Sequence, residues 1–195
     1  MIIVFSRHGE TSANTKDIFQ GASDFQLTEI GIEQSRTLGK LFKGMKIKRI
    51  YSSPSQRAKK TALIAAKICG GDVIVDQRLR EVCYGRWEGV EHRQLVNEKE
   101  WAKRSEDVFN FIHPGTYKSK KGESYKNQYF RLIDFLEQTK NDRHNIGVVA
   151  HLGIMRNAYM YFARLSEEEF GNFKPKNNEV LIFDTKHFKM SHLSV

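Results

Sequence analysis

The chain has 195 residues, of which 39% are hydrophobic, and a formal net charge of +9. This length suits one domain with a full hydrophobic core, and the small number of prolines, 3, argues against long disordered segments. The first apolar run is too short for a signal peptide or a membrane span, so we expect a cytoplasmic location and no membrane partner. The positive charge indicates a solvated surface or a basic pocket for an anion, because no motif for nucleic-acid binding is present.

The first quarter of the chain predicts a strand, a loop, a helix and a second strand. Residues 2–5 are all apolar, which is typical of a buried strand, and a cation, an imidazole and a glycine follow shortly after them. A polar loop over residues 10–27 leads to a helix that Thr28 caps and Gly44 ends. Residues 47–51 then predict the second strand.

The next segment predicts a helix that begins at Ser53 and Pro54, with Ser53 as its N-cap and Pro54 at the first helical position. We expect this helix to run to about Cys69, where a pair of glycines ends it. A short strand follows at residues 73–75. Residues 79–89 are of mixed polarity and contain two glycines, so they predict an irregular segment.

The middle of the chain is the part with the weakest pattern. Residues 91–110 predict a helix but are poorly patterned, and residues 113–122 predict a loop. We therefore expect residues 91–122 to form a lid-like insertion over an active site. Its basic side chains Lys103, Arg104 and Lys118 are expected to face water and not the distal group of a substrate.

The last third of the chain returns to a regular alternation of helices and strands. The predicted elements are a helix at residues 124–138, a strand at 145–150, a helix at about 154–165, and strands at 179–184 and 188–193. Strands that alternate with helices predict an α/β fold. We expect a three-layer α/β/α sandwich with a mostly parallel central sheet, as a single domain over residues 1–195.

Two of the predicted buried strands are followed by a histidine. If these strands are neighbours in a parallel sheet, His8 and His151 meet at one edge of it. Arg7 lies at the same edge, and so does Arg57, which follows the second strand on the first turn of a helix. Arginine side chains and helix N-termini bind phosphate oxygens, and a neutral imidazole is a competent nucleophile. The group therefore predicts a site for phosphoryl transfer.

Five short blocks in a fixed order carry a resemblance to a known family. They are Arg7-His8-Gly9-Glu10-Thr11, Tyr51-Ser52-Ser53-Pro54-Ser55-Gln56-Arg57-Ala58, Leu79-Arg80-Glu81 with Gly85-Arg86-Trp87-Glu88-Gly89, Gly122-Glu123-Ser124, and Val149-Ala150-His151-Leu152-Gly153. Together they resemble the histidine phosphatase superfamily, which is also called phosphoglycerate mutase-like. One block alone would be a weak signal, but five in register make chance a poor explanation.

The resemblance implies a role for each matching residue. His8 would be the nucleophile that forms a phosphohistidine, and Arg7, Arg57 and His151 would hold the phosphoryl group. Glu81 would protonate the leaving group and then activate water. The residues that would line or shape the pocket are Asn14, Gln20, Gly21, Tyr84 and Leu152. No metal or other cofactor is expected, since the sequence offers neither a carboxylate cluster nor a CxxC pair.

Side chains outside this set are expected to be structural or solvent-exposed. This group contains the remaining histidines and the tryptophans, together with two acidic residues close to the motifs: His92, His113, His144, His187, His192, Trp87, Trp101, Glu10 and Glu88. Glu10 and Glu88 are expected to support their loops and not to act as the acid.

The sequence favours a phosphatase over a mutase. The stretch from Glu81 to His151 is compact, and the apolar Ile154 stands where the mutases of the family place a polar residue. We expect a metal-independent phosphomonoesterase that acts through a phosphohistidine on a small anionic phosphorylated metabolite. Two alternatives stay open: a cofactor-dependent phosphoglycerate mutase, and a non-catalytic module that binds phosphate or nucleic acid. The sequence does not indicate the physiological substrate or an oligomeric state.

Overall fold

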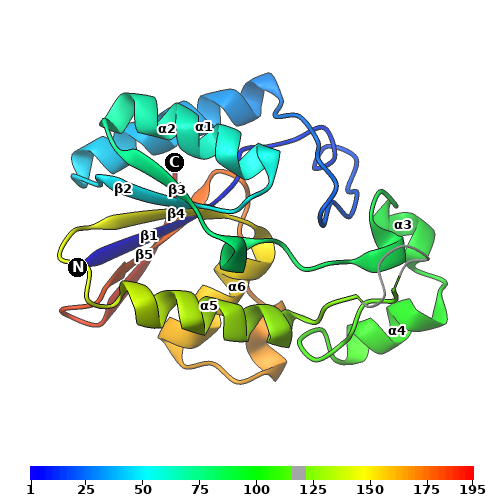
Figure 1. Ribbon diagram of the computed structural model, residues 1–195. Helices are drawn as coiled ribbons and strands as arrows, with labels where there is room; N and C mark the ends of the chain where they lie inside the picture. The colour runs from blue at the N-terminus through cyan, green and yellow to red at the C-terminus, as the bar shows by residue number, and fades with distance from the viewer. Residues whose placement is uncertain (116–121) are drawn as a thin grey trace.

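The computed structural model describes residues 1–115 and 122–195, which contain a sheet of six strands (Figure 1). The strands are β1 (Ile2–Arg7), β2 (Arg49–Ser52), β3 (Asp72–Val75), β4 (Ile146–Ala150), β5 (Glu179–Asp184) and β6 (Lys189–Ser194). Their order is β3-β2-β4-β1-β5-β6. The first four are mutually parallel, and β5 and β6 are antiparallel to their neighbours. The expected α/β fold with a mostly parallel sheet is confirmed.

Helices cover both faces of the sheet (Figure 1). The α-helices are α1 (Glu29–Gly44), α2 (Gln56–Cys69), α3 (His92–Leu95), α4 (Lys99–Glu106), α5 (Tyr125–Thr139) and α6 (Leu152–Ala163). The described ranges also contain three short 3₁₀ helices, η1 (Gln77–Leu79), η2 (Gly85–Trp87) and η3 (Glu168–Gly171). Helices α1 and α2 pack on one face, α5 and α6 on the other, and α3 and α4 lie to one side of the sandwich.

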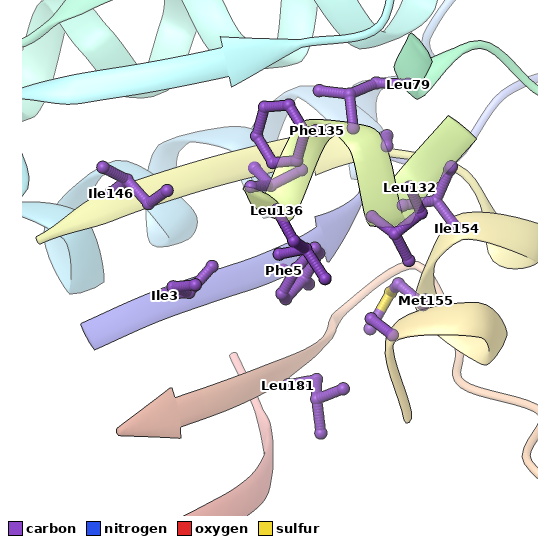
Figure 2. Packing of buried hydrophobic residues seen from close by; sticks show 13 residues of the cluster. Ile3, Phe5, Leu79, Leu132, Phe135, Leu136, Ile146, Ile154, Met155 and Leu181 are labelled. Atoms are coloured by element: carbon purple, nitrogen blue, oxygen red, sulfur yellow. The ribbon is translucent and has the colours of Figure 1, made fainter. Parts of the chain in front are cut away.

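The sheet separates two apolar cores because successive side chains of a strand point to opposite faces. Along β1, Ile3 and Phe5 belong to the core beneath α5 and α6, which Figure 2 shows, whereas Val4 belongs to the core beneath α1 and α2. Phe5 and Val4 are fully buried. Burial of side chains of this size contributes about 1.5–3 kcal/mol each, so the two faces together hold β1 in the centre of the molecule.

Helix ends follow the expected capping chemistry in most places. The Thr28 hydroxyl accepts a hydrogen bond from the Gly31 amide at the start of α1, and Ser124 and Asn127 form a reciprocal capping box on α5. Gly70 ends α2 in the left-handed conformation, with φ 68°.

The predicted start of the second helix was wrong. Helix α2 begins at Gln56 with Ser55 as its N-cap, two residues after the expected position. The Ser53 hydroxyl lies 2.7 Å from Nε2 of His151 and also accepts from the Ser55 amide at 3.3 Å, so Ser53 belongs to a turn that precedes the helix. The α2 N-terminus is capped from outside instead, because the Gln56 amide donates to the Asp24 carboxylate at 3.0 Å.

The insertion also differs from its sequence pattern. In place of one helix over residues 91–110, the chain forms the short helices α3 and α4. These pack around a third apolar cluster whose buried members include Phe19, Trp87 and Phe109. Within the two described ranges, no helix combines the length and apolarity that a membrane crossing requires.

Candidate active site

The register of the parallel strands brings both histidines to one edge of the sheet. Arg7 at the end of β1 pairs with Ala150 at the end of β4, and the His8 amide extends the pairing by donating to the Ala150 carbonyl at 2.9 Å. The rings of His8 and His151 therefore meet edge to face, with centroids 5.4 Å apart. The carboxyl ends of parallel strands are where open α/β sheets place their ligands.

The imidazole of His8 is held in one orientation and one charge state. Its Nδ1 lies 2.8 Å from the Gly9 carbonyl, to which a neutral ring donates its proton. This leaves the lone pair on Nε2. Burial, reinforced by the guanidinium groups of Arg57 and Arg7, holds the pKa of His8 well below its usual range. The ring is therefore neutral at pH 7, as a nucleophile must be.

Arg57 is almost fully buried, with 2% of its surface exposed. Its guanidinium donates to the carbonyls of Ser23 and Gly21, at 2.7 and 2.8 Å, and one of its nitrogens lies 3.3 Å from Nδ1 of His151. Burial lowers its pKa, and Glu81 is the strongest of the acidic groups that oppose this shift. The loop over residues 10–27 therefore fixes the position of this cation.

Both predicted arginines keep a donor free. Nε of Arg7 and Nε of Arg57 are buried and have no hydrogen-bond partner in the described residues. Arg7 is tied through another nitrogen to the Pro175 carbonyl at 2.9 Å. Burial lowers the pKa of Arg7 to about 10, so it is still a cation at pH 7. Two buried cations with unused donors beside a neutral imidazole suit an anion such as a phosphoryl group.

His151 is completely buried and engaged on both sides of its ring. Its Nδ1 faces an Arg57 nitrogen, which can only donate, so Nε2 carries the proton and donates to the Ser53 hydroxyl at 2.7 Å. Burial, followed by the charge of Arg57, holds its pKa well below the usual range. His151 does not border the cavity described next. It contacts the site through His8 and Arg57.

A cavity of about 510 Å³ opens in front of His8. Every residue that the sequence assigned to the pocket lines it, namely Asn14, Gln20, Gly21, Tyr84 and Leu152, together with Arg7, His8, Arg57 and Glu81. Gly21 has φ 51°, and a Cβ there would lie 2.2 Å from the Glu88 carboxylate. A glycine is therefore required where the loop carries the carbonyl that binds Arg57.

Glu81 follows η1 and is half-buried at the edge of this cavity. Its Oε1 accepts from the Val82 amide at 2.9 Å and from the Gln128 side chain at 3.0 Å. The two other acidic residues near the motifs are used elsewhere: Glu10 accepts from the Thr28 hydroxyl, and Glu88 accepts from the Tyr84 amide. Asp17 also lines the cavity, but its carboxylate is exposed and lies 3.3 Å from Nδ1 of His92. Glu81 is therefore the half-buried carboxylate that the fold brings to this cavity.

Several cavity residues were not found from the sequence. The expectation that Arg104 faces water was wrong: it lines the cavity, and its guanidinium lies 5.3 Å from the Trp101 ring centroid. Lys103 is exposed as expected, and Lys118 lies outside the described residues. His92 and Trp101 also line the cavity, although both were expected to be structural or core residues.

The C-terminal third of the chain adds further residues, Arg156, Lys174, Lys176 and Asn177. Asn177 donates to the His8 carbonyl at 2.8 Å, which ties the segment before β5 to the end of β1. In the sequence, the run of basic and polar residues at 174–178 could have indicated that this segment contributes to an anion site. The sequence alone did not indicate that Arg104 lines the cavity or that Ser53 contacts His151. In residues 1–115 and 122–195, no cluster of three or more His, Cys, Asp or Glu side chains suits a metal ion.

Comparisons with known proteins show which family the chain resembles. The profile of the histidine phosphatase superfamily (branch 1) matches residues 3–194. The chain is 30% identical over 188 residues to the 2,3-bisphosphoglycerate-dependent phosphoglycerate mutase of Thermoplasma acidophilum. The aligned region covers 95% of this chain and 88% of that protein. It is 29% identical over 174 residues to phosphoserine phosphatase 1 of Hydrogenobacter thermophilus, which covers 88% and 80% of the two chains.

Among solved structures, the α-ribazole phosphatase of Shigella flexneri superposes with a TM-score of 0.84 at 23% identity, over 100% of this chain and 96% of that one. This structural similarity shows that the two proteins share a fold. The match to the superfamily profile extends over the sheet, the covering helices and the strand ends that carry His8 and His151. The chain belongs to the histidine phosphatase superfamily.

Proposed function

We propose that the protein is a phosphomonoesterase that passes a phosphoryl group from a small anionic metabolite to His8 and then to water. The observation that carries this proposal is the neutral, oriented imidazole of His8 near two buried arginines whose Nε atoms have no partner among residues 1–115 and 122–195. Phosphoryl transfer requires positioning and charge stabilisation more than any other chemistry, and this arrangement supplies both.

In the first step, Nε2 of His8 attacks phosphorus in line with the ester oxygen. The N–P bond forms while the P–O bond to the leaving group breaks. Glu81, in its protonated form, gives its proton to the departing oxygen, so that the alcohol leaves neutral. Arg7 and Arg57 stabilise the negative charge on the transferring oxygens. His151 keeps Arg57 and His8 in place through the contacts described above.

In the second step, water attacks the phosphohistidine. The Glu81 carboxylate accepts a proton from this water, the new O–P bond forms and the N–P bond breaks. Inorganic phosphate and a neutral His8 result, and Glu81 is again protonated for the next cycle. No metal takes part in this scheme, because the arginine side chains stabilise the negative charge of the phosphoryl group. The mechanism therefore predicts that activity is unchanged by EDTA.

The substrate class follows from the charges around the cavity. Arg104, Lys174 and Lys176 line it in addition to the two arginines beside His8, which suits a metabolite with a second anionic group. Phosphoserine carries such a group, and a relative is named for phosphoserine hydrolysis. We propose the described part of residues 91–122, including α4, as the lid of this single domain, since Trp101 and Arg104 border the cavity.

The same cations also suit a mutase, which must hold a second anionic group, and a relative at 30% identity is named as one. Two observations support hydrolysis instead. Ile154 is fully buried in the core beneath α5 and α6 and offers no polar contact to a substrate. Leu152 places an apolar side chain on the cavity wall. With 3-phosphoglycerate as substrate, a phosphatase releases phosphate, whereas a mutase forms 2-phosphoglycerate when 2,3-bisphosphoglycerate is added.

The proposed function is tested by trapping the intermediate. The wild-type protein is mixed with p-nitrophenyl phosphate, and both nitrophenol release and acid-labile phosphate on the protein are measured. His8→Ala should abolish both signals, because it removes the nucleophile. His144→Ala is the matched control, since that ring is exposed and distant from the cavity. A His8→Ala protein with full activity contradicts the mechanism. Salt-sensitive RNA binding by a protein without turnover would favour the non-catalytic alternative.

A further inference from the structure

The carboxylate of Glu81 is held by only one of its two oxygens. Oε1 accepts both the Val82 amide, at 2.9 Å, and the Gln128 side-chain amide, at 3.0 Å. None of the hydrogen bonds among the described residues falls on Oε2. Two donors on one oxygen fix the rotation of the carboxylate and leave the other oxygen for proton exchange.

Gln128 is a fully buried polar side chain on α5. Its Nε2 donates to Oε1 of Glu81 and to the Arg80 carbonyl, both at 3.0 Å. Its Oε1 accepts from the Asn157 side chain of α6 at 3.2 Å. Because an amide nitrogen of Asn157 can only donate, it selects the orientation of Gln128 in which the NH₂ group faces Glu81. Asn157 in turn donates to the Tyr125 carbonyl at 3.2 Å.

Close packing holds this chain of amides in place. Gly153 on the first turn of α6 lies so near that a Cβ there would be 2.3 Å from Oε1 of Gln128 and 2.7 Å from Oε1 of Glu81. The absence of a side chain at Gly153 lets α6 approach both groups. Neither Gln128 nor Glu81 has room to change rotamer toward α6, so the position of the carboxylate is set by its surroundings.

A buried glutamine can simply tie a helix to a loop, and here that tie is already provided by other residues. Arg131 on α5 donates to both oxygens of Glu123 at 2.9 Å and to the Arg80 carbonyl at 3.3 Å. The loop that carries Glu81 is therefore attached to α5 without Gln128. What Gln128 adds is the hydrogen bond to the carboxylate itself.

We propose that Gln128 is a positioning residue for acid–base catalysis, which fixes the Glu81 carboxylate with Oε2 available to the leaving group. Asn157 keeps Gln128 in the orientation that donates. This inference rests on the proposed role of Glu81 as the proton donor. It applies to both steps, since the same carboxylate later accepts the proton of the attacking water.

The test uses the full-length protein and a series of phosphomonoesters whose alcohols are progressively poorer leaving groups: p-nitrophenyl phosphate, phenyl phosphate and phosphoserine. Proton donation matters little for nitrophenolate and strongly for an aliphatic alcohol. The kcat/KM ratio covers the steps up to release of the alcohol, so hydrolysis of the phosphohistidine does not affect it. The readout is the dependence of kcat/KM on the leaving group, which a loss of folded protein does not change.

Gln128→Met removes the donor at similar volume, and Gln128→Glu keeps the shape but puts a carboxylate in the donor's place. For both variants we expect kcat/KM to fall by about 10- to 100-fold for the poorest leaving group and by no more than about 3-fold for p-nitrophenyl phosphate. Thr139→Val is the matched control, because it removes a buried hydroxyl on the same helix that bonds only to helix carbonyls.

An equal loss for all esters, or no loss, overturns the positioning role of Gln128. The proposal is also overturned if Gln128→Glu shows the same dependence of kcat/KM on the leaving group as the wild type, because that variant has no amide donor. Failure of the underlying mechanism has a different signature: the wild-type protein then forms no phosphohistidine, or Glu81→Gln leaves the leaving-group dependence unchanged. The two failures are therefore distinguished within one set of measurements.

Discussion

At the scale of single residues, the site depends on a few buried side chains, each of which is held in one conformation by its hydrogen-bond partners. Arg57 shows this most clearly, because two backbone carbonyls hold it while its Nε has no partner in the described part of the chain. A buried donor without a partner costs about 1–3 kcal/mol. That cost is offset when an anion binds to Nε. The conformation of Arg57 therefore favours anion binding and does not add to the stability of the fold.

Replacement of Arg57 tests this assignment. We expect Arg57→Ala to lower kcat/KM by about 100- to 1000-fold, the usual effect of removing one charge-stabilising donor. Arg57→Lys should recover only part of the activity, because an ammonium group cannot reproduce the planar fork of the guanidinium. Steady-state hydrolysis of p-nitrophenyl phosphate measures the effect. Arg36→Ala, at an exposed position on α1, is the control, and activity near wild type in Arg57→Ala contradicts the assignment.

At the scale of elements, the sequence was sufficient for the strands and for the ends that carry chemistry. Apolar runs predicted β1 and β4, and the histidine after each run lies at the shared edge. Two features were missed because they depend on contacts between distant segments. The Ser53 hydroxyl contacts His151, 98 residues away, and the helix begins two residues later than expected. Arg104 lies over Phe19 and Trp101 only once α4 has packed against the first loop.

The cap that replaces Ser53 gives a prediction about α2. The Gln56 amide donates to Asp24, which lies in the loop over residues 10–27 and is exposed to solvent. Asp24→Ala should lower the free energy of unfolding by about 1 kcal/mol, as the loss of an N-cap usually does. Urea unfolding followed by circular dichroism measures the change. Thr37→Ala on the exposed face of α1 is the comparison variant, and an equal effect there would contradict a capping role for Asp24.

At the scale of the whole molecule, the fold concentrates neutral imidazoles in its interior. His8 and His151 lie at the end of the sheet, and His113, within the insertion, is buried against the rings of Tyr84 and Trp87. Burial lowers the pKa of each, and that of His113 falls to about 4. The folded protein therefore takes up fewer protons than the unfolded chain once the pH falls below the ordinary histidine value of about 6.5.

This difference predicts how stability depends on pH. Because the unfolded state binds more protons, the free energy of unfolding falls as the pH is lowered from about 6.5 toward 4, and the contribution of His113 is fully present only above about 6.5. Each neutral histidine adds a slope of up to about 1.4 kcal/mol per pH unit in that range. His113→Phe cannot titrate, so its stability should depend on pH less steeply than that of the wild type. Urea unfolding across this pH range measures both slopes, and equal slopes would mean that His113 is already protonated in the folded state.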